Sequence, residues 1–266
     1  MQKVTSKDGT IIAYDRIGKG PTIILIDGAL QYRAFDQGTV QLANLLKDHF
    51  TVYYYDRRGR GDSTDTQPYA IEREIEDLEA LINIAGGCTF IFGISSGGAL
   101  AMEATIKLDN KIRKLAMYEV PYNSDENARQ AWKEYRQRLN ELLNAGNKKD
   151  ALALFMMLTG MPADQVPEMR KHPMWPMLEA IAHTLAYDAA ILGEDASVPL
   201  ERAARIAVPT LIMAGETSYP FMHITAKALA NAIPNAQYLT LTGQTHEVAA
   251  EAIAPVLIEF FTIRNI

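Results

Sequence analysis

The sequence predicts an α/β fold in which helices flank a mostly parallel sheet. Strand-like and helix-like segments alternate from Thr10 to Gly98, and this alternation is typical of parallel strands covered on both faces. The segment from Ile71 to Ala85 carries apolar side chains at helical spacing with acidic side chains opposite, which predicts a helix packed on the sheet. Between Pro121 and Val208 the strand-like segments stop, which indicates a helical insertion.

Each expected strand is a short apolar run bounded by polar or turn-forming residues. In chain order, the strands are expected at Thr10–Ile17, Thr22–Ile26, Thr51–Tyr55, Thr89–Phe92, Lys114–Tyr118, Thr210–Ala214 and Gln237–Leu241. After the last strand, apolar side chains recur at helical spacing from Ile253 to Phe260, which predicts a closing amphipathic helix.

The insertion is expected to be helical throughout. Asn123 and Ser124 are expected to cap its first helix, which has an acidic first turn followed by apolar side chains three and four positions apart. Further helices, separated by glycine and proline, are expected at 150–158, 174–192 and 200–206.

The length and composition favour one globular domain that carries this insertion. The chain has 266 residues, of which 48% are hydrophobic and 22% charged, enough to bury a large core. No flexible linker separates the parts, so residues 1–121 and 208–266 are expected to form the core domain. Residues 122–207 are then a helical cap packed on it.

The net charge and the lack of long apolar stretches argue against nucleic acid and membranes as partners. The formal net charge of −6 offers no basic face for nucleic acid or an anionic membrane surface. No apolar stretch reaches the roughly 18 residues that span a bilayer, and Met1–Thr5 lacks the apolar segment of a signal peptide. We therefore expect a cytoplasmic protein that acts on a small molecule. A homodimer is left open, because nothing in the residues sets the oligomeric state.

A G-x-S-x-G pentapeptide supplies the candidate nucleophile. The segment Gly93–Gly97 follows an apolar strand and opens a helix-like stretch. At such a turn the central serine adopts a strained backbone conformation, and the glycines allow close approach of the neighbouring chain, so the hydroxyl of Ser95 is exposed above the sheet edge.

A serine nucleophile needs a base, most often a histidine. The chain has five histidines. We favour His246, because it lies in the loop between the last strand and the closing helix, where its ring can point along the carboxyl edge of the sheet toward Ser95.

Four segments resemble the α/β-hydrolase fold family, and the resemblance extends over almost the whole chain. They are the Ser95 elbow, the loop that contains His246, Ile26–Ala29 and Tyr55–Ser63. The last of these is similar to the family's D-x-R-G-x-G-x-S run. The resemblance implies an eight-stranded sheet, a cap after the sixth strand, and a nucleophile, acid and histidine in that chain order.

The sequence departs from the commonest family pattern at the triad acid. Ser218 stands where an aspartate is expected after the seventh strand, and serine cannot hold a negative charge against an imidazolium. We favour Glu119, at the end of the sixth strand, because some haloalkane dehalogenases of this fold place a glutamate there. Glu216 is the runner-up and Asp27 a distant third.

The second departure is Asp27, where the family commonly has histidine. The oxyanion hole does not depend on that side chain, because backbone N–H groups form it, here those of Ala29 and Ser96. Asp27 is expected to be either a turn carboxylate that accepts local backbone hydrogen bonds or a contact to substrate.

These residues predict a serine hydrolase of a carboxylic ester or lactone that acts through an acyl-enzyme. No metal or nucleotide motif is present, so no cofactor is expected. A cluster of methionine and aromatic side chains in the cap indicates an apolar substrate or, alternatively, the packed underside of the cap helices. A ligand-binding receptor or a non-hydrolytic carbon–carbon lyase on the same fold is the alternative function.

Overall fold

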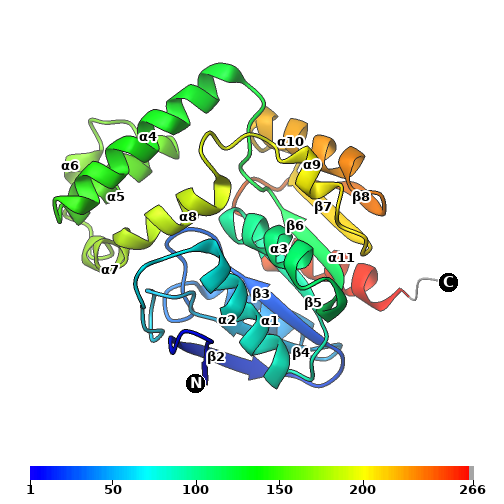
Figure 1. Ribbon diagram of the computed structural model, residues 1–266. Helices are drawn as coiled ribbons and strands as arrows, with labels where there is room; N and C mark the ends of the chain where they lie inside the picture. Colours follow the sequence, from blue (N-terminus) through cyan, green and yellow to red (C-terminus); the bar gives the residue numbers. More distant parts are fainter. Residues whose placement is uncertain (264–266) are drawn as a thin grey trace.

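An eight-stranded sheet with helices on both faces organises the computed structural model, which describes residues 1–263. The strand order is β1-β2-β4-β3-β5-β6-β7-β8 (Figure 1). Strand β2 pairs antiparallel with both β1 and β4, and all the other pairs are parallel. The strands are β1 (Gln2–Thr5), β2 (Ile11–Ile17), β3 (Thr22–Ile26), β4 (Thr51–Tyr55), β5 (Thr89–Ile94), β6 (Ile112–Tyr118), β7 (Thr210–Gly215) and β8 (Ala236–Leu241). The central strands are buried apolar runs, as expected of parallel strands covered on both faces.

Two layers of helices bury the two faces of the sheet. On one face, α1 (Gln37–Leu46) packs against α11 (Ala250–Thr262), and the two share an apolar cluster with alternate side chains of the strands. On the other face lie α2 (Ile71–Ile84), α3 (Ser96–Lys107) and α10 (Pro220–Ala232), over a second cluster. The predicted fold class is therefore confirmed.

All the helices between β6 and β7 belong to one insertion. They are α4 (Glu126–Asn144), α5 (Lys148–Leu158), α6 (Val166–Met169), α7 (Trp175–Ala180), the 3-10 helix η2 (Ala182–Thr184), α8 (Leu185–Leu192) and α9 (Leu200–Ala203). Helices α4 to α7 share an apolar cluster with η2, α8 and Leu30 of the loop after β3. Helix α8 runs between them and the sheet, where it packs on α2 and α3 (Figure 1). The division into a core and a cap domain at residues 122 and 207 stays a prediction.

The structure corrects three details of the expected elements. Strand β1 was not expected, because this short edge strand is polar and mostly exposed. The N-cap of α4 is Asp125, not Asn123 or Ser124, because its carboxylate accepts the N–H of Ala128. The single helix expected over 174–192 is interrupted by η2, where the Thr184 hydroxyl binds a backbone carbonyl. Among residues 1–263, no helix is both long enough and apolar enough to cross a membrane.

Candidate active site

The turn between β5 and α3 has the tight geometry predicted for a nucleophile elbow. Ser95 has φ 55° and ψ −128°, a region that non-glycine residues occupy only when the surrounding structure holds them there. A Cβ at Gly97 would lie 2.3 Å from the carbonyl oxygen of Ile26, and a Cβ at Gly93 would lie 2.4 Å from that of Gly97. Only glycine permits these approaches, so the sequence G-x-S-x-G fixes the turn.

The neighbouring strands hold the backbone of Ser95 at the carboxyl edge of the sheet. Its N–H donates to the carbonyl of Tyr118, the last residue of β6, at 2.9 Å. From the other side, a Cβ at Gly28, just after β3, would lie 3.1 Å from the Ser95 Cβ. Ser95 therefore sits between the ends of β3 and β6, where parallel sheets of this kind build their sites.

Glu119 and His246 meet at the same edge, although 127 positions separate them in the chain. The Nδ1 atom of His246 lies 2.7 Å from Oε2 of Glu119. Glu119 is 1% exposed, whereas the His246 side chain is 36% exposed. A buried carboxylate thus fixes the ring of a partly exposed histidine, as a carboxylate does when it orients the imidazole of a catalytic triad.

Two further donors hold the Glu119 carboxylate. The N–H of Gly215 donates to Oε1 at 2.7 Å, and the hydroxyl of Ser218 donates to Oε2 at 2.8 Å. Burial by itself raises the pKa of Glu119, but the hydrogen bonds from His246, Gly215 and Ser218 outweigh it and lower the pKa. The carboxylate is therefore ionised at neutral pH.

Neither of the other candidate acids reaches His246. Glu216 accepts the backbone N–H of Gly243 at 2.8 Å and so closes the turn after β8. Asp27 accepts the Thr39 hydroxyl at 2.6 Å. Of the three carboxylates considered, only Glu119 bonds to the imidazole.

The loop after β3 places two backbone donors near the elbow. The Gly28 N–H is occupied, because it donates to Oε1 of Gln31 at 2.8 Å. The N–H groups of Ala29 and Ser96 donate to no other group of residues 1–263, and Ser96 is the first residue of α3. Free N–H groups at a helix N-terminus and an adjacent loop are suited to bind an oxyanion.

Asp27 does not accept the local backbone hydrogen bonds expected of a turn carboxylate. It is only 4% exposed, and its Oδ2 atom is buried without a hydrogen-bond partner. Burial, with the nearby charge of Asp36, raises its pKa to about 7. The contact of Asp27 with substrate stays a prediction.

The structure thus brings several predicted site residues together at one edge, but not through every expected contact. Glu119 contacts His246, and the Gly28 turn contacts Ser95. Within residues 1–263 no hydrogen bond joins the Ser95 hydroxyl to His246. Such bonds are often long before substrate binds, and the catalytic roles of Ser95, His246 and Glu119 stay predictions.

Sequence reasoning missed the polar groups that support this edge. Ser218 was seen only as a missing aspartate, and Tyr118 was read only as a strand residue, yet its hydroxyl donates to the carbonyl of Thr245, next to His246. Arg57 and Arg60, at the variable positions of the D-x-R-G-x-G-x-S run, are buried with Asp188 of α8. The available signal was that these arginines closely follow a buried apolar strand, because buried cations require partners.

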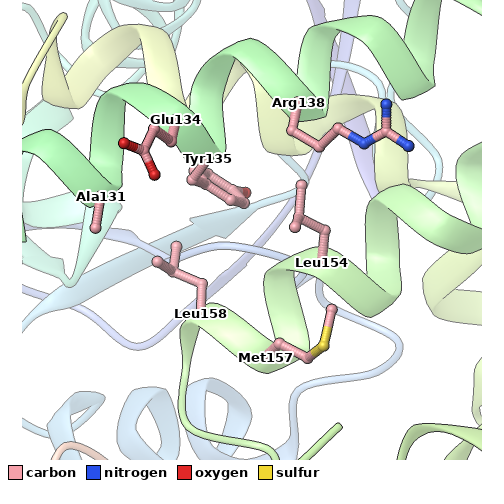
Figure 2. A pocket seen from close by; sticks show the side chains of 7 residues that line it. All are labelled: Ala131, Glu134, Tyr135, Arg138, Leu154, Met157 and Leu158. Carbon is pink, nitrogen blue, oxygen red and sulfur yellow. The ribbon is translucent and has the colours of Figure 1, made fainter.

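The two cavities described in the structure lie within the insertion. One, of about 310 Å³, opens between α4 and α5, where Tyr135 and Leu154 face each other (Figure 2). The other, of about 580 Å³, includes Met161 and His172. Most of the insertion's methionine and aromatic side chains belong to an apolar cluster that also includes Leu30 of the loop after β3. The apolar substrate stays a prediction. No group of three or more potential metal ligands occurs within the described part of the chain.

Comparisons with known proteins agree with this architecture. An alpha/beta hydrolase of solved structure from Sphaerobacter thermophilus DSM 20745 is 49% identical, with a TM-score of 0.86 over 98% of this chain and 100% of that chain. The enol-lactonase from Burkholderia xenovorans LB400 is 19% identical, with a TM-score of 0.68 over 98% of this chain and 100% of that chain, a likeness that shows the fold alone.

A match to the uncharacterized hydrolase YraK from Bacillus subtilis (strain 168) is 28% identical over 116 residues. It covers 42% of this chain and 41% of that protein, so it spans less than half of the relative's length. The family model of the alpha/beta hydrolase family matches residues 27–256, from the loop after β3 to the closing helix. The chain therefore belongs to the alpha/beta hydrolase family.

Proposed function

We propose that this protein is a serine hydrolase that cleaves a carboxylic ester or a lactone through an acyl-enzyme. The observation that carries the proposal is the 2.7 Å contact between Glu119 and His246 at the sheet edge that bears the Ser95 elbow. An imidazole oriented by a buried carboxylate, at the sheet edge that carries a half-buried serine, is suited to activate that hydroxyl for attack on a carbonyl.

In the proposed reaction, His246 accepts the proton of Ser95 as the hydroxyl oxygen bonds to the substrate carbonyl carbon. The negative charge that develops on the carbonyl oxygen is stabilised by the N–H groups of Ala29 and Ser96. His246 then donates the proton to the leaving alkoxide oxygen as the carbon–oxygen bond breaks, which leaves the acyl group on Ser95.

Water completes the cycle. His246 removes a proton from a water molecule, whose oxygen attacks the acyl carbon, and returns the proton to Ser95 as the acid product leaves. Throughout, Glu119 accepts from Nδ1 of His246, which keeps the ring in the tautomer that has a free Nε2 and stabilises the imidazolium.

A labelling experiment tests the proposal. The wild-type protein is incubated with a serine-directed phosphonate and, separately, with a short-chain aryl ester. We expect stoichiometric labelling of Ser95 and turnover of the ester, and loss of both in Ser95→Ala. Labelling without turnover would favour a ligand-binding receptor or a carbon–carbon lyase, and the absence of both would overturn the proposal.

A further inference from the structure

Two buried arginines donate hydrogen bonds to the two peptide groups that precede the Ala29 side of the proposed oxyanion hole. Arg60 donates through Nη1 to the carbonyl of Gly28, and Arg57 donates through Nη1 to the carbonyl of Asp27 at 3.3 Å. Both guanidinium groups are 1% exposed. A guanidinium is a planar fork with fixed donor directions, so it can hold a carbonyl in one orientation.

The orientation of the Gly28 carbonyl decides where the Ala29 N–H points. The two groups belong to one planar trans peptide, so they point in opposite directions. Arg60 therefore turns the Ala29 N–H away from itself by holding the Gly28 oxygen. The Gly28 N–H is fixed in a similar way, because the same peptide carries the Asp27 carbonyl that Arg57 binds.

Both arginines are held in turn by one carboxylate of the insertion. Asp188 on α8 accepts from Arg60 at Oδ2 and from Arg57 at Oδ1, both at 2.7 Å. Its Oδ1 also accepts the hydroxyl of Ser96 at 2.7 Å. Ser96 supplies the second proposed oxyanion donor. Asp188 therefore contacts both Arg60, which binds the peptide of the Ala29 N–H, and the side chain of Ser96.

The charges of this cluster require Asp188 to be ionised. Burial by itself raises the pKa of Asp188, but Arg60 and Arg57, with the hydrogen bond from Ser96, outweigh it and lower the pKa. Glu74 of α2 neutralises the second positive charge by binding Arg57 through both carboxylate oxygens at 2.8 Å. Two buried cations thus face two buried anions, a geometry that fixes each partner closely.

We propose that Asp188 and Arg60 are positioning residues for the oxyanion hole, so that helix α8 of the insertion sets the geometry of the N–H groups of Ala29 and Ser96. This inference rests on the proposed function. Neither residue touches the reacting atoms; each acts through the backbone or side chain that it holds. The catalytic core and the insertion are therefore parts of one site.

The test compares Asp188→Asn with Asp77→Asn. Asp77 is a matched control, because it is a buried helix carboxylate that binds Arg58 through two hydrogen bonds of 2.8 and 2.7 Å, with no contact to the oxyanion loop or to Ser96. We measure kcat, KM, inhibition by an aryl trifluoromethyl ketone and the melting temperature of each variant at pH 8.

The ketone reports on the hole directly, because its adduct with serine carries an oxyanion. For Asp188→Asn we expect kcat to fall at least about tenfold and ketone inhibition to weaken similarly, with KM changed less than about threefold. For Asp77→Asn we expect a lower melting temperature with unchanged kcat. If both variants fold and have equal kcat, the inference is wrong.

Arg60→Lys decides the matter if Asp188→Asn does not fold. Lysine keeps the positive charge beside Asp188, but one ammonium cannot reproduce the fork that binds both Asp188 and the Gly28 carbonyl. We expect kcat to fall about tenfold at unchanged KM, and full activity would overturn the inference. A wild-type protein with neither ester turnover nor phosphonate labelling would instead remove the proposed function, and this inference with it.

Discussion

Ser218 donates a hydrogen bond from its hydroxyl to Glu119, from the loop where the family resemblance places a triad aspartate. In this pair the carboxylate belongs to the residue after β6, and the residue in the loop after β7 is a neutral hydrogen-bond donor. Glu119 has a positive φ of 48°, an uncommon backbone conformation for a side chain of its size. The 2.7 Å hydrogen bond from Gly215 and the contact to His246 hold it in place.

At the scale of single residues, we predict that turnover depends on Glu119 as the triad acid. In Glu119→Gln the amide cannot stabilise the imidazolium or select its tautomer, so we expect kcat for the aryl ester to fall by roughly 10³- to 10⁴-fold. Circular dichroism should show an unchanged fold, because the substitution is isosteric.

Glu216→Gln is the matched control for this measurement. Glu216 lies at the same sheet edge but binds the N–H of Gly243 and not His246. We therefore expect the kcat of this variant to stay within about fivefold of the wild type, a change of about 1 kcal/mol in the barrier. The assignment of the acid is wrong if Glu216→Gln loses turnover and Glu119→Gln keeps it.

At the scale of elements, the β5–α3 elbow is joined to β3 by direct backbone contact. A Cβ on Gly97 would meet two carbonyl oxygens, those of Ile26 at 2.3 Å and Asp27 at 2.5 Å. Backbone atoms in the middle of a sheet cannot move aside as the end of a side chain can. The start of α3 therefore packs directly against the backbone that leads into the loop with the Ala29 N–H.

We expect Gly97→Ala to lower the free energy of unfolding by about 3 kcal/mol or more, because overpacking against fixed backbone is costly. Urea unfolding of the purified variant measures this loss. Gly98→Ala serves as the comparison, because its Cβ would first meet a side-chain methyl of Val120, at 2.8 Å, which has some freedom to shift. A loss in Gly97→Ala no greater than in Gly98→Ala would contradict the prediction.

At the scale of the whole molecule, buried carboxyl groups form two sets with opposite effects on stability. Burial raises the pKa of Asp27 to about 7 and that of Asp77 to about 6. Despite burial, hydrogen bonds and cationic partners lower the pKa values of Glu119 and Asp188. The first set binds protons more tightly in the folded protein than in the unfolded chain, and the second set binds them less tightly.

The two sets predict a stability maximum in mildly acidic solution. As pH rises from about 4 to about 7, the folded protein must ionise Asp27 and Asp77 at a cost, so the free energy of unfolding falls. As pH falls below about 4, Glu119 and Asp188 must be protonated and their hydrogen bonds and ion pairs are lost. Urea unfolding between pH 3 and pH 9 should therefore show greater stability at pH 5 than at pH 8.

The Asp27→Asn variant tests how much of the fall in stability between pH 5 and pH 8 comes from the ionisation of Asp27. The interval between 3.8 and about 7 for the pKa of Asp27 corresponds to at most about 4 kcal/mol, and the amide does not titrate. The variant should lose less stability than the wild type between pH 5 and pH 8. A wild-type profile that rises over this interval would refute the prediction.

Much of the fold could be predicted from local patterns. The parallel strands and the helix at Ile71–Ile84 lie where apolar runs and helical spacing predict them, because both patterns reflect burial of one face or of both. The polar edge strand Gln2–Thr5 carries neither pattern, and the break at Ala182–Thr184 depends on a hydroxyl that binds the backbone. Neither feature leaves a periodic pattern in the sequence, so neither could be predicted from it.

The sequence by itself determined the family, the elbow at Ser95 and a histidine loop at the same sheet edge, because glycine spacing and strand–helix alternation are local properties of the chain. It favoured Glu119 as the acid, with Glu216 as the runner-up. Only the tertiary structure shows which of the two contacts His246, because a 2.7 Å contact across 127 positions depends on which strands are neighbours. For the same reason the sequence did not reveal the link from Asp188 to the oxyanion loop. Asp188 belongs to the insertion, its partners come from the loop after β4 and from α3, and no spacing in the chain records that they meet.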